Sequence, residues 1–117
     1  MTQLESIGRL ETTELFDDVV IVSVAGPLDA RIARALRDLL FPLGAGDNLV
    51  LVLDLSDAHG LDDEALGVVS EAAHLVQRFG GRLPIVTRSR TIVARVKECG
   101  LGDIVSIHPS VEHAVDG

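Results

Sequence analysis

Residues 49–55 read LVLVLDL, an apolar run whose alternating positions are hydrophobic on both sides. Successive side chains of a β-strand point to opposite faces of the sheet. A strand that is apolar on both faces therefore has to be covered on both faces. Parallel sheets flanked by helices bury their central strands in this way. The run therefore predicts a central strand in an α/β fold.

The segments around this strand alternate between strand and helix patterns. A β-branched strand is predicted at 19–25, after an amphipathic strand at 9–15 and a turn at Asp17–Asp18, which indicates an antiparallel hairpin. Asp29 is expected to cap a helix that ends in GAGDN, with Ile32, Leu36, Leu39, Leu40 and Leu43 on one face. Further helices are predicted at 63–79, 91–100 and 109–115, and short strands at 82–87 and 104–107.

This order of elements predicts the fold class. Alternating strands and helices indicate a mixed, mostly parallel sheet of about five strands with about four helices, and with the antiparallel strand at one side. A length of 117 residues suits a single domain spanning 1–117.

Charge and cysteine content narrow the class of protein. Acidic residues number 18 and basic residues 10, so the net charge is -8, which disfavours a generic nucleic-acid binder. The single cysteine, Cys99, allows no internal disulfide and fits a reducing compartment. The first residues lack the pattern of a signal peptide, and the apolar runs are far shorter than the ~20 residues of a membrane span. We expect a soluble, cytoplasmic protein without membrane insertion.

The most unusual stretch is GLDDEALG at 60–67, where Asp62, Asp63 and Glu64 follow the central strand and open a helix. A helix start carries a partial positive charge, so capping by these carboxylates is the simplest interpretation. A Mg²⁺ site is disfavoured because consecutive helical side chains diverge by about 100°. A receiver-type phospho-acceptor aspartate is disfavoured because no acidic pair follows strand 19–25 and no lysine follows strand 104–107.

Several other polar residues near this end of the fold have simple structural interpretations. Ser56 is expected to form a hydrogen bond within a turn, and Ser89 is expected to cap the following helix. Ser70, on the helix predicted at 63–79, is a weak candidate for phosphorylation. His59 precedes the acidic run and is interpreted as an exposed loop residue, with pairing to a carboxylate as the alternative. The remaining expectations are a buried, inert Cys99 and a solvated turn carrying Arg88 and Arg90, which could instead contact a partner.

Several motifs, in order along the chain, resemble those of the STAS domain family. GPLDARIARAL at 26–36 resembles that family's G-E-L-D-x-x-T-A-x-x-L, and the run 49–69 resembles its V-V-L-D-L-S-x-V-x-F-x-D-S-S-G-L-G-V. FGGRLPIV at 79–86 resembles G-G-x-L-x-L-V, and Ser89, Gly100, Leu101 and Ile104 match more loosely. The resemblance covers roughly 9–115.

The resemblance implies a regulatory binding protein, with no catalysis of its own and no cofactor or metal. In the anti-sigma factor antagonists of this family, the first serine of D-S-S-G-L-G is phosphorylated by the partner anti-sigma factor, a serine kinase, and the unphosphorylated form binds that kinase. Asp62 matches the family's aspartate, Asp63 its phosphorylated serine and Glu64 the next hydroxyl residue. Ala65 matches the glycine, and Leu66 and Gly67 keep the pattern.

Asp63 therefore leaves two opposite interpretations open. Its charge either mimics phosphoserine and blocks binding, or belongs to a binder that phosphorylation cannot switch off. The resemblance implies that a serine-kinase anti-sigma factor contacts Asp29, His59 and the segment from Asp62 through Gly67, and it leaves a homodimer open. An accessory or scaffold subunit of a transporter or stressosome-like assembly is the alternative. An enzyme or nucleotide binder is weakest, since no phosphate-cradling glycine loop precedes the carboxylates.

Overall fold

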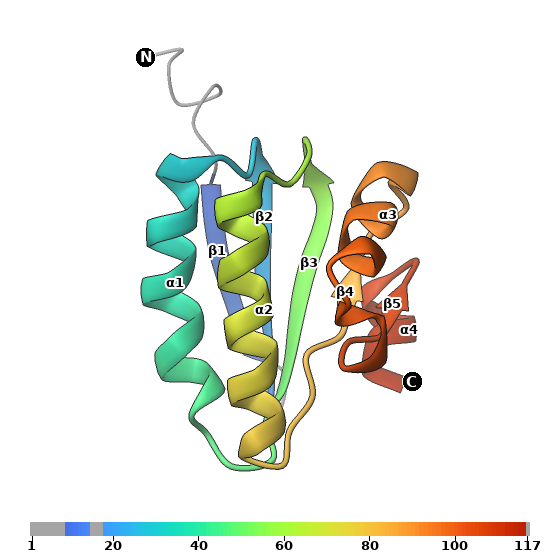
Figure 1. Cartoon of the computed structure of the whole chain (residues 1–117). Coiled ribbons are helices and arrows are strands. Elements are labelled where there is room, and N and C mark those ends of the chain that lie inside the picture. Colours follow the sequence, from blue (N-terminus) through green and yellow to red (C-terminus); the bar gives the residue numbers. More distant parts are fainter. Residues whose placement is uncertain (1–8, 15–17, 117) are drawn as a thin grey trace.

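The protein folds into a five-stranded sheet with helices on both faces (Figure 1). The computed structural model describes residues 9–14 and 18–116. The strands are β1 (Arg9–Glu14), β2 (Val19–Gly26), β3 (Val50–Ala58), β4 (Ile85–Val86) and β5 (Ile107–His108). The helices are α1 (Ala30–Gly44), α2 (Asp63–Arg78), α3 (Arg90–Glu98) and α4 (Val111–Asp116), with a short 3₁₀ helix, η2 (Leu101–Asp103).

The strands lie in the order β1-β2-β3-β4-β5. β1 pairs with β2 in antiparallel fashion, and every later neighbour is parallel. The described residues thus contain the mixed sheet and the four α-helices that the sequence predicts. Leu15 and Asp17, which were expected in the first strand and its turn, lie outside the described residues.

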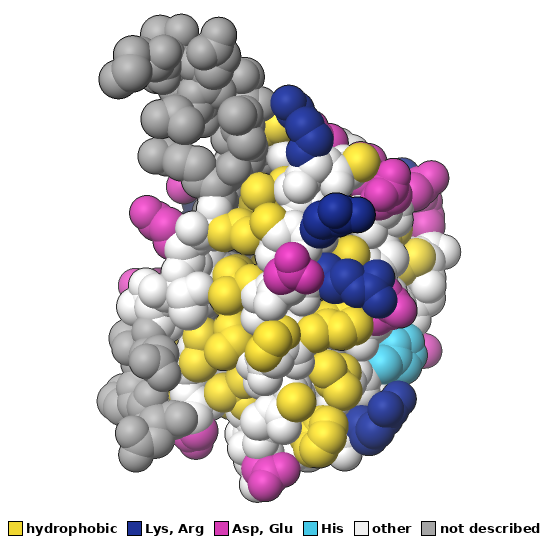
Figure 2. Space-filling model, turned by 90° about the vertical axis from the view of Figure 1, so that its left-hand side faces the viewer, with side chains coloured by type: hydrophobic (Ala, Val, Ile, Leu, Met, Phe, Trp, Pro, Cys, Tyr) yellow, Lys and Arg dark blue, Asp and Glu magenta, His cyan; other side chains and the backbone are white. Residues whose placement is uncertain are grey.

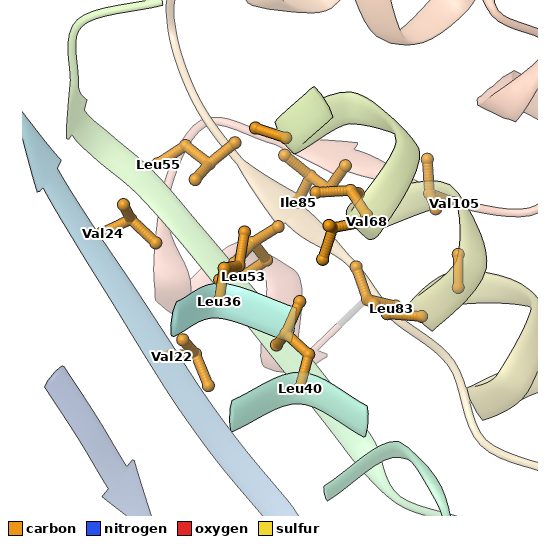
Figure 3. Close-up of a cluster of buried hydrophobic side chains, with 14 of the residues drawn as sticks. Val22, Val24, Leu36, Leu40, Leu53, Leu55, Val68, Leu83, Ile85 and Val105 are labelled. Carbon is orange, nitrogen blue, oxygen red and sulfur yellow. The ribbon is translucent and has the colours of Figure 1, made fainter. Parts of the chain in front are cut away.

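The main core lies between the sheet and helices α1, α2 and α3. Leu53 and Leu55 of β3 point into it beside Val22 and Val24 of β2, as Figure 3 shows. Leu36 and Leu40 of α1 and Val68 of α2 enter from the helical layer. Helical spacing brings these side chains to one face, where burying a leucine stabilises the fold by roughly 1.5–3 kcal/mol.

A smaller core lies on the opposite face of the sheet, under α4. Val52 of β3 is fully buried there with Val19, Ile21, Val86 and Ala114. Both faces of β3 are therefore covered, which confirms the expectation drawn from LVLVLDL. None of the helices in the described ranges is long and apolar enough to cross a bilayer.

Two predicted strands are shorter in the structure than the sequence suggested. The strand expected at 82–87 is reduced to β4, since Pro84 lacks an N–H group and Arg82 forms only an isolated bridge with Val50. The strand expected at 104–107 is also wrong in position. Ile104 and Val105 donate their N–H groups to the Leu101 carbonyl at 3.0 and 2.9 Å, so they continue the turn of η2, and β5 begins only at Ile107.

The expectation of a buried Cys99 is wrong. The residue follows the last turn of α3 as its C-cap, and its side chain is exposed. Its helical spacing does match buried Ile92 and Val96, but α3 ends at Glu98 and Gly100 turns the chain with a φ of 83°. Helical spacing therefore continued past the end of the core.

The short helix α4 is held to the sheet by a polar cluster. The Arg82 guanidinium donates to the Ala114 and Val115 carbonyls at 3.2 Å each, which satisfies the C-terminal end of the helix. Nδ1 of buried His108 lies 2.8 Å from Nδ1 of His113. Burial, followed by the positive charges of His113 and Arg82, lowers the pKa of His108 below its usual 6.5.

This lowered pKa makes stability depend on pH. The unfolded chain takes up a proton at His108 more readily than the folded protein. Stability should therefore be full above about pH 6.5 and fall as the pH drops below it. In urea titrations at pH 8 and 5.5, His108→Gln is expected to lose less free energy of unfolding on acidification than the wild type. The exposed control His74→Gln should retain the wild-type loss, and an equal loss in both variants would contradict this account.

Candidate functional site

The starts of α1 and α2 lie next to each other at one end of the sheet (Figure 1). Parallel β2 and β3 end at the same edge, and two backbone hydrogen bonds join the loop after β3 to the end of β2 and to the loop after it. His59 N donates to the Gly26 carbonyl at 2.8 Å, and Asp62 N donates to the Leu28 carbonyl at 3.0 Å. Leu28 and Leu61 are buried beneath these loops. This is the edge where ligands of α/β folds usually bind.

Asp29 caps α1 as the sequence predicts. Its Oδ1 accepts from the N–H groups of Arg31 at 3.0 Å and Ile32 at 3.3 Å, and its Oδ2 lies 3.0 Å from the Arg31 guanidinium. The side-chain hydrogen bond from Arg31 is the main reason that the pKa of Asp29 falls below its ordinary value. This carboxylate is therefore charged at neutral pH and tied to its own helix.

The three carboxylates at the start of α2 have different roles. Asp62 is the N-cap, and its Oδ1 accepts from the Ala65 N–H at 3.0 Å. Asp63 and Glu64 follow in the first turn, where the helix dipole favours negative charge, and both are exposed. Capping thus accounts for how the fold tolerates this run.

Asp63 also forms an ion pair that the sequence did not suggest. Its Oδ1 lies 2.5 Å from Nη2 of Arg95, which α3 supplies from 32 positions later in the chain. The Asp63 side chain is 95% exposed and that of Arg95 32% exposed. Because Arg95 matches no local motif and sits beside the buried face of α3, only the packing of α3 near α2 could reveal this partner.

The remaining expected site residues are divided between surface and core. His59 is exposed, and within the described part of the chain its ring makes no hydrogen bond, as the loop interpretation held. Gly67 is exposed, and a Cβ built there would meet no atom within 4 Å. Ala65 is fully buried and Leu66 half-buried, so their side chains support the surface from below.

A groove with one mainly basic wall and one acidic wall runs between α1 and α2 from this end. The wall from α1 carries Arg31, Arg34 and Arg37 together with one carboxylate, Asp38, and the wall from α2 carries Asp63, Glu64 and Glu71. Arg37 and Glu71 approach to 3.8 Å across it. Figure 2 views the side of α1 and shows basic and acidic side chains gathered on one part of it, with apolar surface beside them. Such a surface is suited to a partner that presents both signs of charge.

The hydroxyls and carboxylates of this end take structural roles. Ser89 Oγ accepts from the Ile92 N–H at 3.2 Å, which confirms the predicted cap. Ser56 Oγ donates to Asp54 Oδ1 at 2.6 Å, but the turn expected at Ser56 is wrong, because pairing with β2 continues and keeps Ser56 within β3. Ser70 is half-buried on α2. Among the residues that the structure describes, no group of three or more His, Cys, Asp and Glu side chains is arranged to hold a metal ion.

Comparison with known proteins identifies the family. The STAS domain family model matches residues 12–114, so the chain belongs to the STAS domain family. It is 32% identical over 94 residues to the anti-sigma-B factor antagonist of Bacillus subtilis, covering 80% of this chain and 85% of that protein. It is 27% identical over 106 residues to the anti-sigma-F factor antagonist RsfA of Mycobacterium tuberculosis, covering 89% and 83% of the two chains.

The fold agrees with this assignment. The crystal structure of an anti-sigma factor antagonist from Mycobacterium paratuberculosis superimposes with a TM-score of 0.81 at 22% identity, covering 95% of this chain and 93% of that one.

The different roles of Asp62 and Asp63 should be measurable in stability. Asp62→Ala removes an N-cap and is expected to lower the free energy of unfolding by about 0.5–2 kcal/mol in urea titrations. Asp63→Ala removes an exposed ion pair and should lower it by no more than about 1 kcal/mol. A larger loss for Asp63→Ala than for Asp62→Ala would contradict the assignment of Asp62 as the cap.

Proposed function

We propose that the protein is an anti-sigma factor antagonist that binds a serine-kinase-type anti-sigma factor through the exposed starts of α1 and α2. Membership of the STAS family and the names of its relatives support this function. The proposed contact surface consists of Asp29, His59, Asp62, Asp63, Glu64 and Gly67, together with the charged groove beside them.

We further propose that phosphorylation at position 63 does not switch this antagonist off. A carboxylate takes no stable phosphate from a serine kinase. The observation that carries the proposal is the Asp63–Arg95 ion pair, in which one positive charge lies 2.5 Å from the carboxylate. Phosphoserine would place about 1.5–2 negative charges at this position. A single carboxylate that is partly offset by Arg95 and by the helix start is a poor imitation of that state.

Gly67 supplies a second argument for a contact at this surface. A glycine inside a helix costs about 0.5–1 kcal/mol relative to alanine, and in this fold nothing near Gly67 requires its small size. A close-packed partner does provide such a requirement, because only glycine lets another backbone approach the helix at this point. Gly67 therefore suits a surface that is covered in a complex.

The binding experiment uses the serine-kinase anti-sigma factors of the source cell as candidate partners. Titration calorimetry with wild type, Asp63→Asn and Asp63→Ser is expected to show binding of all three to the same partner, with affinities within about threefold. A tenfold or greater gain on Asp63→Asn would mean that Asp63 mimics phosphoserine and holds the protein in the non-binding state. Failure of the wild type and both variants to bind any of these kinases would refute the proposed function.

Phosphoryl transfer separates switchable from unswitchable forms. With the bound kinase and ATP, Asp63→Ser should gain one phosphate at residue 63 in peptide mass spectrometry, whereas the wild type should gain none there. Phosphorylation of the wild type at Ser70 or another hydroxyl, with release of the kinase, would contradict the unswitchable state.

Gly67→Ala should separate folding from binding. The variant is expected to raise the free energy of unfolding by about 0.5–1 kcal/mol and to weaken the kinase complex at least tenfold. Gln77→Ala, an exposed change three turns further along α2, should leave the affinity unaltered. Unchanged affinity for Gly67→Ala would remove this residue from the contact.

A further inference from the structure

A second groove lies on the other side of the molecule's helical layer, between α3 and the edge strand β5. The α3 wall is formed by Arg90, Val93, Ala94 and Lys97, and the facing wall by Ile107 and Pro109. Its middle is apolar, and its ends carry cations. Among the strands that the structure describes, β5 is the last of the sheet, so this groove is bounded by an edge strand.

The residues on the α3 wall form one stripe of the helix. Positions 90, 93, 94 and 97 follow the i, i+3, i+4, i+7 spacing that brings side chains onto a single face. Ile92 and Val96 are fully buried on a different face, and Arg95 turns toward α2 to reach Asp63. The stripe therefore lies apart from the buried face of α3 and from the proposed contact surface at the starts of α1 and α2.

The Lys, Arg, Asp and Glu side chains that line this groove are all of the basic kind. Arg88, Arg90 and Lys97 line it, and none of the carboxylates in the described residues does. The chain as a whole has 18 acidic and only 10 basic residues. Three of those ten basic residues therefore surround one apolar strip, which is complementary to a partner that combines acidic and apolar side chains.

The spacing of the cations fits a helix better than an extended strand. Arg90 and Lys97 lie seven residues apart on α3, which is about 10 Å along the axis. A second helix presents two side chains at the same separation when they are seven residues apart. An added strand is less suitable, because β5 has only two residues and Pro109 follows without an N–H group.

We propose that this groove binds an amphipathic helix of a partner protein. That helix carries two acidic residues seven positions apart, and apolar residues at the third and fourth positions after the first acidic one. The acidic groups meet Arg90 and Lys97, and the apolar groups pack on Val93, Ala94 and Ile107. Binding of this kind follows the helix-in-groove mode of recognition. The site is separate from the α2 start, so it does not depend on the proposed antagonist function.

The test uses a fluorescent 18-residue helical peptide that has Glu at two positions seven apart. Leu occupies the third and fourth positions after the first Glu. Fluorescence anisotropy should show saturable binding to the wild type that weakens with added salt. Lys97→Glu is expected to weaken it at least tenfold, and Lys97→Gln several-fold. The control Arg78→Glu makes the same charge change on exposed α2 and should alter it less than twofold. Replacing both Glu residues of the peptide by Gln should also weaken binding at least tenfold.

Three results would overturn the proposal. The first is the absence of saturable peptide binding, or binding that Lys97→Glu leaves unchanged while the variant keeps its thermal unfolding transition. The second is saturable binding of dodecanoate, lost in Lys97→Glu, without peptide binding, which would assign the groove to a small anionic amphiphile. The third is a dimer in sedimentation that Lys97→Glu dissociates, which would assign it to a second copy of this chain.

Discussion

Two backbone hydrogen bonds join the end of β2 and the loop after it to the loop after β3, at the end of the sheet that carries the candidate site. One joins His59 to Gly26 and the other joins Asp62 to Leu28, and parallel pairing of β2 and β3 delivers the loops to the same edge. The two helix starts are placed side by side as a result. The charged groove between α1 and α2 depends on that placement. Because Leu61 and Leu28 are buried below, the loops are anchored by apolar burial as well.

Electrostatics then explains how three adjacent carboxylates can occupy the start of α2. Asp62 satisfies an N–H group of the helix, and Arg95 compensates Asp63 from α3. The Asp63–Arg95 pair is expected to contribute little to stability, since exposed ion pairs add little to the free energy of folding. The Arg95 guanidinium partly offsets the negative charge at position 63, which we propose to correspond to the family's phosphorylatable serine. Under the proposed function, the same residue excludes phosphorylation and differs from phosphoserine in its charge.

Much of the architecture follows from local pattern. The two-sided apolar run at 49–55, the helical periodicity of α1 and α2, and the caps at Asp29, Asp62 and Ser89 each have a local physical cause. The predictions from sequence were wrong where contacts between distant segments determine the structure. Cys99 continues the helical spacing of the buried residues of α3, but it lies after the end of that helix and is exposed. Pro84 lacks an N–H group, so the strand predicted at 82–87 is shorter in the structure. The Asp63–Arg95 pair joins residues 32 positions apart, so no local pattern could contain it.

We propose that Asp63 leaves the protein permanently able to bind its anti-sigma factor. The most direct measurement is the dissociation constant of the wild-type complex after prolonged incubation with ATP and Mg²⁺, compared with the constant after incubation with ADP and Mg²⁺. Any direct effect of the nucleotide on the kinase is subtracted with a kinase variant that cannot transfer phosphate. We expect the two corrected dissociation constants to agree within twofold. A tenfold or greater weakening that requires ATP and an active kinase would show that the protein is switched off after all.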